Sequence, residues 1–178
     1  MNKKAAIGLS INTLVVVIIS LVILGGGITL LYKFIGGAED IKAGLDTRTS
    51  QELERLLLDQ GKQVALPLHV ATVERGDSHV YGIGILNIGP ESSFRIDVEL
   101  SKVIDLNEND ITDRVNSVED WLLYDVVPIS IKENQHRKEG ILVNVPNEAL
   151  VGQYIFSVRV FEGDIQYGNT QKFVVNVK

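Results

Sequence analysis

The chain has 178 residues, of which 17 are Lys or Arg and 23 are Asp or Glu, so its formal net charge is −6. This acidic balance argues against a nucleic-acid-binding protein, because phosphate contacts need a basic surface. The sequence contains no cysteine, which excludes a disulfide scaffold, a zinc site with Cys ligands and a thiol nucleophile.

Residues 1–35 contain a long stretch without any charged side chain. It extends over 28 residues from Ala5 to Tyr32, and only Ser20 interrupts its apolar centre from Leu14 to Leu24. As a helix it would be about 42 Å long, whereas the hydrocarbon core of a bilayer is about 30 Å thick. A helix buried in a protein core would show a polar face, which this stretch lacks. The sequence therefore predicts a short basic leader and a single-pass transmembrane helix within residues 1–35.

The charges on either side of this stretch predict its orientation in the cell membrane. Lys3 and Lys4 precede it, whereas Lys33 alone follows before Glu39 and Asp40. Because basic residues favour the cytoplasmic side, we expect a cytoplasmic N-terminus and a C-terminal domain outside the cell. Of the 17 basic residues, 14 lie beyond Lys33 together with all 23 acidic ones, a net charge of −9 that suits a cell-surface, extracellular domain. A removable secretory signal is the alternative.

The residues Lys4-Ala5-Ala6-Ile7, directly before a long apolar helix, resemble the class III signal of archaeal pilin-like proteins. That family includes archaeal type IV pilins and archaellins. The resemblance implies cleavage between Ala5 and Ala6 by a prepilin-type peptidase, with the helix retained on the mature protein and used for self-assembly. Ser10 occupies the fifth mature position, where many bacterial-type pilins carry Glu. The intersubunit contact attributed to that Glu is therefore not implied for this chain.

Small residues within the predicted helix suggest a surface for packing against other helices. They are Ser20, Gly25, Gly26 and Gly27. In lipid, small side chains let two helix backbones approach closely. Each Gly also costs about 1 kcal/mol of helix stability relative to Ala in an exposed helix. Two interpretations stay open, a packing site used in assembly and an irregularity of the kind common in membrane helices.

Residues 36–65 are predicted to form a flexible stalk followed by a short amphipathic connector helix. Thr49 and Glu52 have the spacing of a capping box, and Gly61 supplies a helix end. Apolar side chains, including Leu53 and Leu57, lie on one face. A helix this short gains most of its stability from tertiary packing, so we expect it to dock on the domain that follows.

Apolar and polar side chains alternate through residues 66–178. Between Phe94 and Leu100, for example, every second side chain is apolar. Other runs of strand length lie at 68–73, 79–88, 121–124, 129–132, 141–145, 154–161 and 173–177. Seven or eight short strands, each with one buried face, indicate an antiparallel β-sandwich.

One detail narrows the type of sandwich. Gly152 and Tyr154 stand at the start of a late strand, an arrangement similar to the corner of immunoglobulin-like domains, where a Tyr hydroxyl bonds to upstream backbone. The expected fold class is therefore mainly β with α. It combines a single N-terminal transmembrane helix, a short amphipathic connector helix and an immunoglobulin-like antiparallel β-sandwich over 66–178.

Candidate chemistry is sparse in this sequence. His69, His79 and His136 lack the spacing of a metal site, and there is no nucleophile elbow, phosphate loop or dinucleotide fingerprint. We therefore expect no enzyme, no catalytic residues and no cofactor. An anchored enzyme would need His69 and His79 to converge with carboxylates in a pocket. Trp121 lies among apolar residues and is expected to be part of the core rather than a platform for a sugar.

The richest acidic stretch begins at Asp105. Oxygen ligands at alternate positions, Asp105, Asn107 and Asn109, imitate the opening of a calcium loop. Asp110 stands where a regular EF-hand has an invariant Gly, which excludes that motif. A looser calcium site remains as an alternative to a solvated acidic loop, which we regard as the better interpretation.

Together these features predict a membrane-anchored cell-surface protein with a structural or adhesive role, and the family resemblance extends this to a pilin-like filament subunit. Its expected partners are the lipid bilayer, other copies of itself through the N-terminal helix, and a prepilin-type peptidase. The alternative is a single-pass protein that does not polymerise and whose β-sandwich binds a ligand or another envelope protein.

Overall fold

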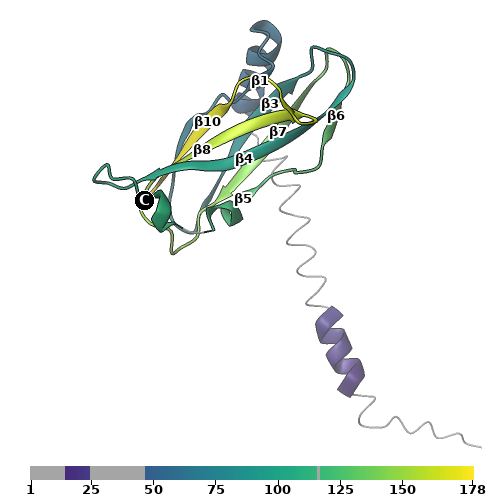
Figure 1. The fold of residues 1–178 in the computed structure, drawn as a ribbon. Coiled ribbons are helices and arrows are strands. Elements are labelled where there is room, and N and C mark those ends of the chain that lie inside the picture. Colours follow the sequence, from purple (N-terminus) through teal and green to yellow (C-terminus); the bar gives the residue numbers. More distant parts are fainter. Residues whose placement is uncertain (1–14, 25–46, 116) are drawn as a thin grey trace, which may run out of the picture. The chain divides into compact units, whose positions relative to one another are not determined.

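The structure is a computed structural model that describes residues 15–24, 47–115 and 117–178. The chain divides into two compact units, Met1–Asp40 and Ile41–Lys178. In the first unit, residues 15–24 form a helix, coloured purple in Figure 1. All nine of its large apolar side chains are exposed, with exposed fractions between 46% and 69%. The hydroxyl of Ser20 donates to the carbonyl oxygen of Val16 at 2.8 Å.

None of the helices in the described part of the chain has the length and apolarity that crossing a membrane requires. The predicted transmembrane helix is therefore not confirmed. Its remaining parts, residues 5–14 and 25–32, lie outside the described residues.

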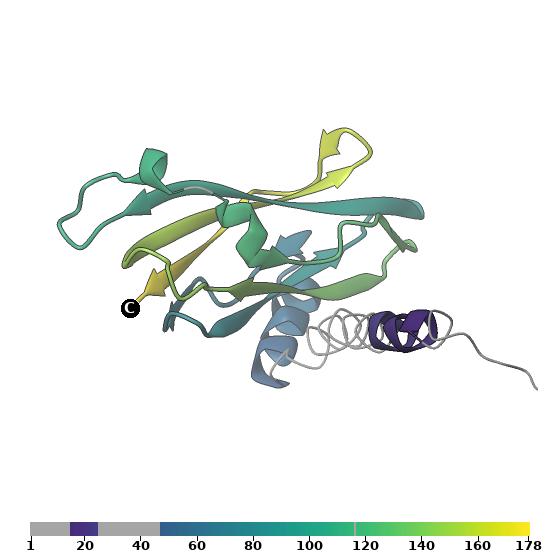
Figure 2. The ribbon, with the colours of Figure 1, turned by 90° about the horizontal axis from the view of Figure 1, so that it is seen from below.

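Two sheets form the second unit, as expected for a β-sandwich (Figures 1 and 2). The four-stranded sheet has the order β1 (Val64–Ala65), β3 (Ser78–Leu86), β7 (His136–Asn144) and β5 (Leu122–Leu123). The six-stranded sheet has the order β2 (Val70–Val73), β10 (Gln171–Val177), β8 (Gly152–Glu162), β4 (Ser92–Ile104) and β6 (Ile129–Ile131), and β9 (Ile165–Gln166) pairs with β8. Short 3-10 helices, η2 (Thr112–Arg114) and η3 (Val118–Trp121), follow β4.

The strand pairs are antiparallel with one exception. Strand β2 lies parallel to β10, with Val70 opposite Val174. Each apolar run predicted from the sequence overlaps a strand, and Gly76 and Gly163, in turns that follow β2 and β8, have φ angles of 85° and 59°. Strand β7 begins at His136, five residues before the predicted run at 141–145, because its first half is polar. The two-residue strands β1 and β9 were not predicted.

Aromatic side chains fill the space between the two sheets. Tyr81 on the four-stranded sheet stacks on Phe173 of the six-stranded sheet with ring centroids 4.2 Å apart, and Phe156 stacks on Phe173 at 5.0 Å. All three are fully buried. The hydroxyl of Tyr81 donates to Val174 O at 2.8 Å, so a hydrogen bond also joins the sheets. Burial raises the pKa of Tyr81, which keeps the phenol protonated as a donor.

The connector helix docks on the outer face of the four-stranded sheet. It consists of α2 (Thr47–Glu54) and a π-helical turn, η1 (Arg55–Asp59). Its apolar side chains form a second core with Leu86 and Ala65; they are Leu53, Leu56 and Leu57. A Cβ added at Gly84 would lie 2.6 Å from Leu57 Cδ1, so glycine permits this close approach. Docking on its own domain, the expected arrangement, is confirmed.

Polar contacts explain two differences from the sequence-based picture of this region. Helix α2 already includes Thr47, so Thr49 lies inside the helix and the predicted capping box is wrong. Glu52 instead accepts hydrogen bonds from Arg55. Lys138, in the polar first half of β7, donates to Glu54 at 2.9 Å and to Ser50 at 3.2 Å. The charge of Lys138 is favourable in this strand because it pairs with Glu54 on the helix.

Strand β8 begins where the backbone of β4 leaves no room for a side chain. A Cβ added at Gly152 would lie 2.6 Å from the backbone oxygen of Ile104. We expect Gly152→Ala to destabilise the sandwich by about 1–3 kcal/mol, the usual cost of overpacking a rigid site. Urea unfolding followed by fluorescence of Trp121, the only Trp in the chain, measures this. Gly89→Ala is the control, because its Cβ would have an ordinary 3.7 Å contact; equal destabilisation in both variants would contradict the explanation.

Candidate functional site

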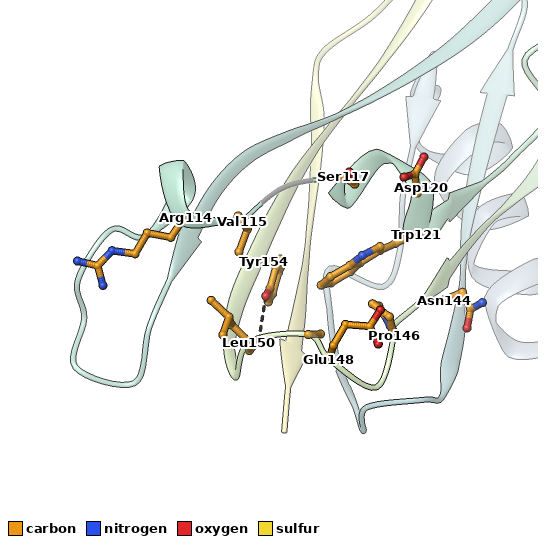
Figure 3. A pocket seen from close by; sticks show the side chains of 11 residues that line it. Arg114, Val115, Ser117, Asp120, Trp121, Asn144, Pro146, Glu148, Leu150 and Tyr154 are labelled. Atoms are coloured by element: carbon orange, nitrogen blue, oxygen red, sulfur yellow. Dashed lines mark hydrogen bonds between the residues drawn. The ribbon is translucent and has the colours of Figure 1, made fainter.

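The start of β8 contains the hydrogen bond predicted from the sequence. The hydroxyl of Tyr154 donates to the carbonyl oxygen of Leu150 at 2.9 Å (Figure 3). The ring of Tyr154 is buried, and burial raises its pKa, so the hydroxyl stays a donor. This tyrosine corner fixes the loop between β7 and β8 against the strand that follows it.

Removing this hydroxyl tests the corner. We expect Tyr154→Phe to lower the free energy of unfolding by about 1–3 kcal/mol, because the carbonyl of Leu150 loses its protein partner. Urea unfolding curves of the two proteins provide the measurement. As a control, Tyr124→Phe removes a longer bond, at 3.3 Å, to the amide of Val98. A larger effect at Tyr124 than at Tyr154 would contradict the assigned role.

A pocket of about 390 Å³ lies beside the tyrosine corner. Three segments that are separate in the sequence form it: the η2–η3 region, the end of β7 with its loop, and the start of β8 (Figure 3). Its lining residues are Arg114, Val115, Ser117, Asp120, Trp121, Asn144, Pro146, Glu148, Ala149, Leu150 and Tyr154. The volume lies within the range of small-molecule sites. This pocket is the candidate functional site.

Trp121 forms part of the pocket wall while its ring belongs to the core. Its exposed fraction is 8%, and its ring lies 4.7 Å from that of Tyr154 at a tilt of 44°. The expectation that Trp121 is a core residue is therefore confirmed. Ser117, just before η3, has a φ of 56°, a left-handed conformation that is uncommon for residues other than glycine. The turn that carries Asp120 and Trp121 thus starts at an unusual backbone conformation.

The predicted calcium loop is closed by its own hydrogen bonds. Asp105 Oδ1 accepts from the backbone amides of Asn107 and Asn109, both at 2.8 Å, and the Asn109 side chain also donates to this carboxylate. These bonds lower the pKa of Asp105. Asp110 accepts from Thr112 and pairs with Lys102 at 3.5 Å. The carboxylate oxygens thus already have donors, and calcium binding stays the alternative to a solvated acidic loop.

The histidines occupy separate environments. His69 Nδ1 lies 3.0 Å from Lys172 O and is exposed. His79 packs edge-on against Tyr81, with ring centroids 4.9 Å apart. Across 15–24, 47–115 and 117–178, no group of three or more His, Cys, Asp or Glu side chains has the geometry to hold a metal ion. The convergence that an anchored enzyme would need is not found among these residues.

His79 makes the stability of the sandwich depend on pH. Burial lowers its pKa below the ordinary value of 6.5, and its buried Nε2 atom has no hydrogen-bond partner among the described residues. The folded state therefore binds this proton less readily than the unfolded state, so stability is complete above about pH 6.5 and falls as the pH drops towards the folded pKa. We expect the melting temperature to fall between pH 7 and pH 5, and to fall less in His79→Phe. Parallel slopes in both proteins would contradict this.

The other predicted sites lie in the N-terminal part of the chain. Lys4, Ala5 and Ala6, the processing residues, lie outside the described residues, as does the glycine run 25–27. Ser20 lies in the described helix, where its hydroxyl bonds to its own helix backbone. The pocket itself was not predicted from the sequence. Only the corner hydrogen bond of Tyr154 and the burial of Trp121, two of its lining residues, were expected. No local pattern connects Asp120 with Glu148, because only the fold of the β7–β8 loop brings these segments together.

No protein-family model matches the chain, and no curated protein matches its sequence. Among solved structures, a family 123 glycoside hydrolase from Clostridium perfringens is similar with a TM-score of 0.51 and 14% identity, over 70% of this chain and 24% of that chain. The chain thus spans about a quarter of that enzyme. At this identity the similarity describes the fold alone and gives no evidence of enzymatic activity.

Two structures from pilus systems are more distant. A chain of the CsuC–CsuE chaperone–tip adhesion subunit complex from Acinetobacter baumannii has a TM-score of 0.38 and 11% identity, over 64% of this chain and 50% of that one. Self-complemented MyfA, the major subunit of Myf fimbriae from Yersinia enterocolitica, has a TM-score of 0.36 and 11% identity, over 64% and 94%. At these TM-scores the likeness carries no argument about this chain.

Proposed function

We propose that this chain is a cell-surface structural or adhesion protein that is anchored in the membrane by its N-terminal helix, and that it assembles as a pilin-like subunit. The observation that carries the proposal is the apolar surface of the helix over residues 15–24. All nine of its large apolar side chains are exposed, and Ser20 is its only polar residue. A helix that is apolar on every side is stable when lipid or other helices surround it.

The β-sandwich supports this proposal because it has hydrophobic cores of its own. Among the described residues, the members of its two cores lie between Leu53 and Val177. The connector helix, which is attached to the sandwich through Leu53, Leu57 and Lys138, completes its outer face. A domain of this kind is suited to display outside the cell, with the apolar helix left for insertion or assembly.

The mature N-terminus tests the pilin-like part of the proposal. The full chain is expressed in a cell that contains a prepilin-type peptidase, recovered from the membrane fraction, and analysed by N-terminal sequencing and intact mass. We expect a chain that begins at Ala6. A chain that retains Met1 or begins at Asn2 would contradict pilin-type processing while leaving a plain membrane anchor intact.

Assembly is tested separately from anchoring. Negative-stain microscopy of material sheared from the surface of intact cells should show filaments that bind an antibody against the β-sandwich. A processed protein that stays in the membrane and yields no filaments would favour the alternative, a single-pass protein that displays its sandwich as a monomer. Protease treatment of intact cells should remove the sandwich in both cases, because both place it outside.

A further inference from the structure

The pocket beside Tyr154 combines an apolar wall with polar groups that are free to bind a ligand. Val115, Pro146, Ala149 and Leu150 supply the wall. The side chains of Ser117, Asp120 and Glu148 line the same space, and none of them has a hydrogen bond or ion pair with another described residue. Among the side chains in Figure 3, the marked hydrogen bond is the one from Tyr154 to Leu150.

These free groups include both donors and acceptors of hydrogen bonds. The carboxylates of Asp120 and Glu148 accept, the indole N–H of Trp121 donates, and Ser117 can do either. Asn144, at the end of β7, adds an amide that also does both. A ligand that satisfies this set needs several hydroxyl groups on a compact body with some apolar surface.

Charge and ring exposure restrict the ligand further. Arg114 extends away from the other labelled side chains, whereas the carboxylates of Asp120 and Glu148 line the pocket (Figure 3). They disfavour an anionic ligand through like-charge repulsion. An organic cation would gain most from an open aromatic face, but the ring of Trp121 is 8% exposed and packs on Tyr154. A neutral ligand with many hydroxyl groups fits both restrictions.

We propose that this pocket binds a neutral sugar unit, with Asp120 and Glu148 accepting hydrogen bonds from sugar hydroxyls, the indole N–H of Trp121 donating to a sugar oxygen, and the Pro146–Leu150 loop contacting the C–H face of the ring. A volume of about 390 Å³ accommodates a ligand of this size. The inference goes beyond the proposed anchoring and assembly, because it concerns the β-sandwich alone and gives a surface protein a means of recognising glycans.

Fluorescence provides a direct test, because Trp121 is the only Trp in the chain. The full chain, purified in a zwitterionic detergent without a sugar headgroup, is titrated with glucose, galactose, mannose, N-acetylglucosamine and their common disaccharides. Glucuronate, which adds a negative charge, and a short alkylammonium are titrated in parallel. Saturation-transfer NMR on the same samples detects binding that does not change the fluorescence.

We expect saturable binding of at least one neutral sugar. If that sugar is glucose, we expect glucuronate to bind at least tenfold more weakly. Asp120→Asn and Glu148→Gln should each weaken binding at least tenfold. The control Asp164→Asn removes an exposed carboxylate at the β8–β9 turn, away from the pocket lining, and should leave binding unchanged. Urea unfolding midpoints equal to that of the unsubstituted chain show that the variants are folded.

Three results would overturn the inference. The first is the lack of saturable binding of any neutral sugar by either method. The second is binding that survives both Asp120→Asn and Glu148→Gln in folded protein. The third is saturable binding of the alkylammonium alone, which would identify a cation site. Each of these leaves the proposed anchoring and processing untouched, because those are read from the N-terminus and the membrane fraction.

Discussion

The double substitution Ile18→Lys and Ile19→Lys is expected to move the protein from the membrane fraction to the soluble fraction. Both side chains lie in the described helix and are 53% exposed. A lysine near the centre of a membrane helix costs about 2.5–3.5 kcal/mol on insertion scales, so two of them outweigh the gain from the neighbouring apolar side chains. Carbonate extraction of membranes, followed by detection of the β-sandwich, measures the distribution.

A matched control adds the same charge elsewhere. Val126→Lys and Val127→Lys alter two valines of the β-sandwich that are 63% and 64% exposed, and this variant should stay in the membrane fraction. If both double variants leave the membrane equally, the change reflects total charge and the anchoring role of residues 15–24 is wrong. If neither leaves it, another part of the chain holds the protein at the membrane.

Phe173→Ala is expected to destabilise the β-sandwich by about 3–5 kcal/mol, the range for removing a buried Phe. Phe173 lies between Tyr81 and Phe156, with ring centroids at 4.2 and 5.0 Å, and so contacts both sheets. A loss of this size is a large part of the 5–15 kcal/mol that stabilises a typical domain. Urea unfolding, followed by the fluorescence of Trp121, measures the change in the free energy of unfolding.

The control for this prediction keeps an apolar side chain in place. Phe173→Leu retains most of the buried volume and should cost clearly less than Phe173→Ala, because the cavity left behind is smaller. Equal losses for Leu and Ala would show that ring stacking, rather than volume, stabilises this part of the core. A loss below about 1 kcal/mol for Ala would contradict the central position of Phe173.

The periodicity of the sequence predicted most of the sandwich, because a strand that is buried on one face has alternating apolar and polar residues. Phe94 to Leu100 alternate in the sequence and lie in β4 with the expected face buried. The polar start of β7 was missed for the opposite reason. Lys138 is favourable there because Glu54, 84 residues earlier in the chain, accepts its hydrogen bond. A contact between residues so far apart in the chain does not affect the local pattern of apolar and polar residues.

Some aspects of the candidate site were likewise visible in the sequence. The hydrogen bond of Tyr154 was predictable because its acceptor, Leu150, is four residues away and belongs to a recurring corner. The partners of Trp121 in the pocket wall were not, because many of them come from segments that are distant from it in the sequence. At Asp105 the sequence pattern suggested a ligand that the structure does not require. Its carboxylate accepts hydrogen bonds from backbone amides of its own loop.

Composition and charge by themselves separate this chain into an apolar N-terminal part and an acidic C-terminal part with a net charge of −9 beyond Lys33. The alternation of apolar and polar side chains along the C-terminal part predicts the β-sandwich, because the solvent preference of each side chain depends on the residue alone. Only the tertiary structure decides that the connector helix lies against Gly84, that β2 runs parallel to β10, and that Asp120 and Glu148 share one pocket. Such features depend on distances between segments, which packing sets and local sequence does not encode.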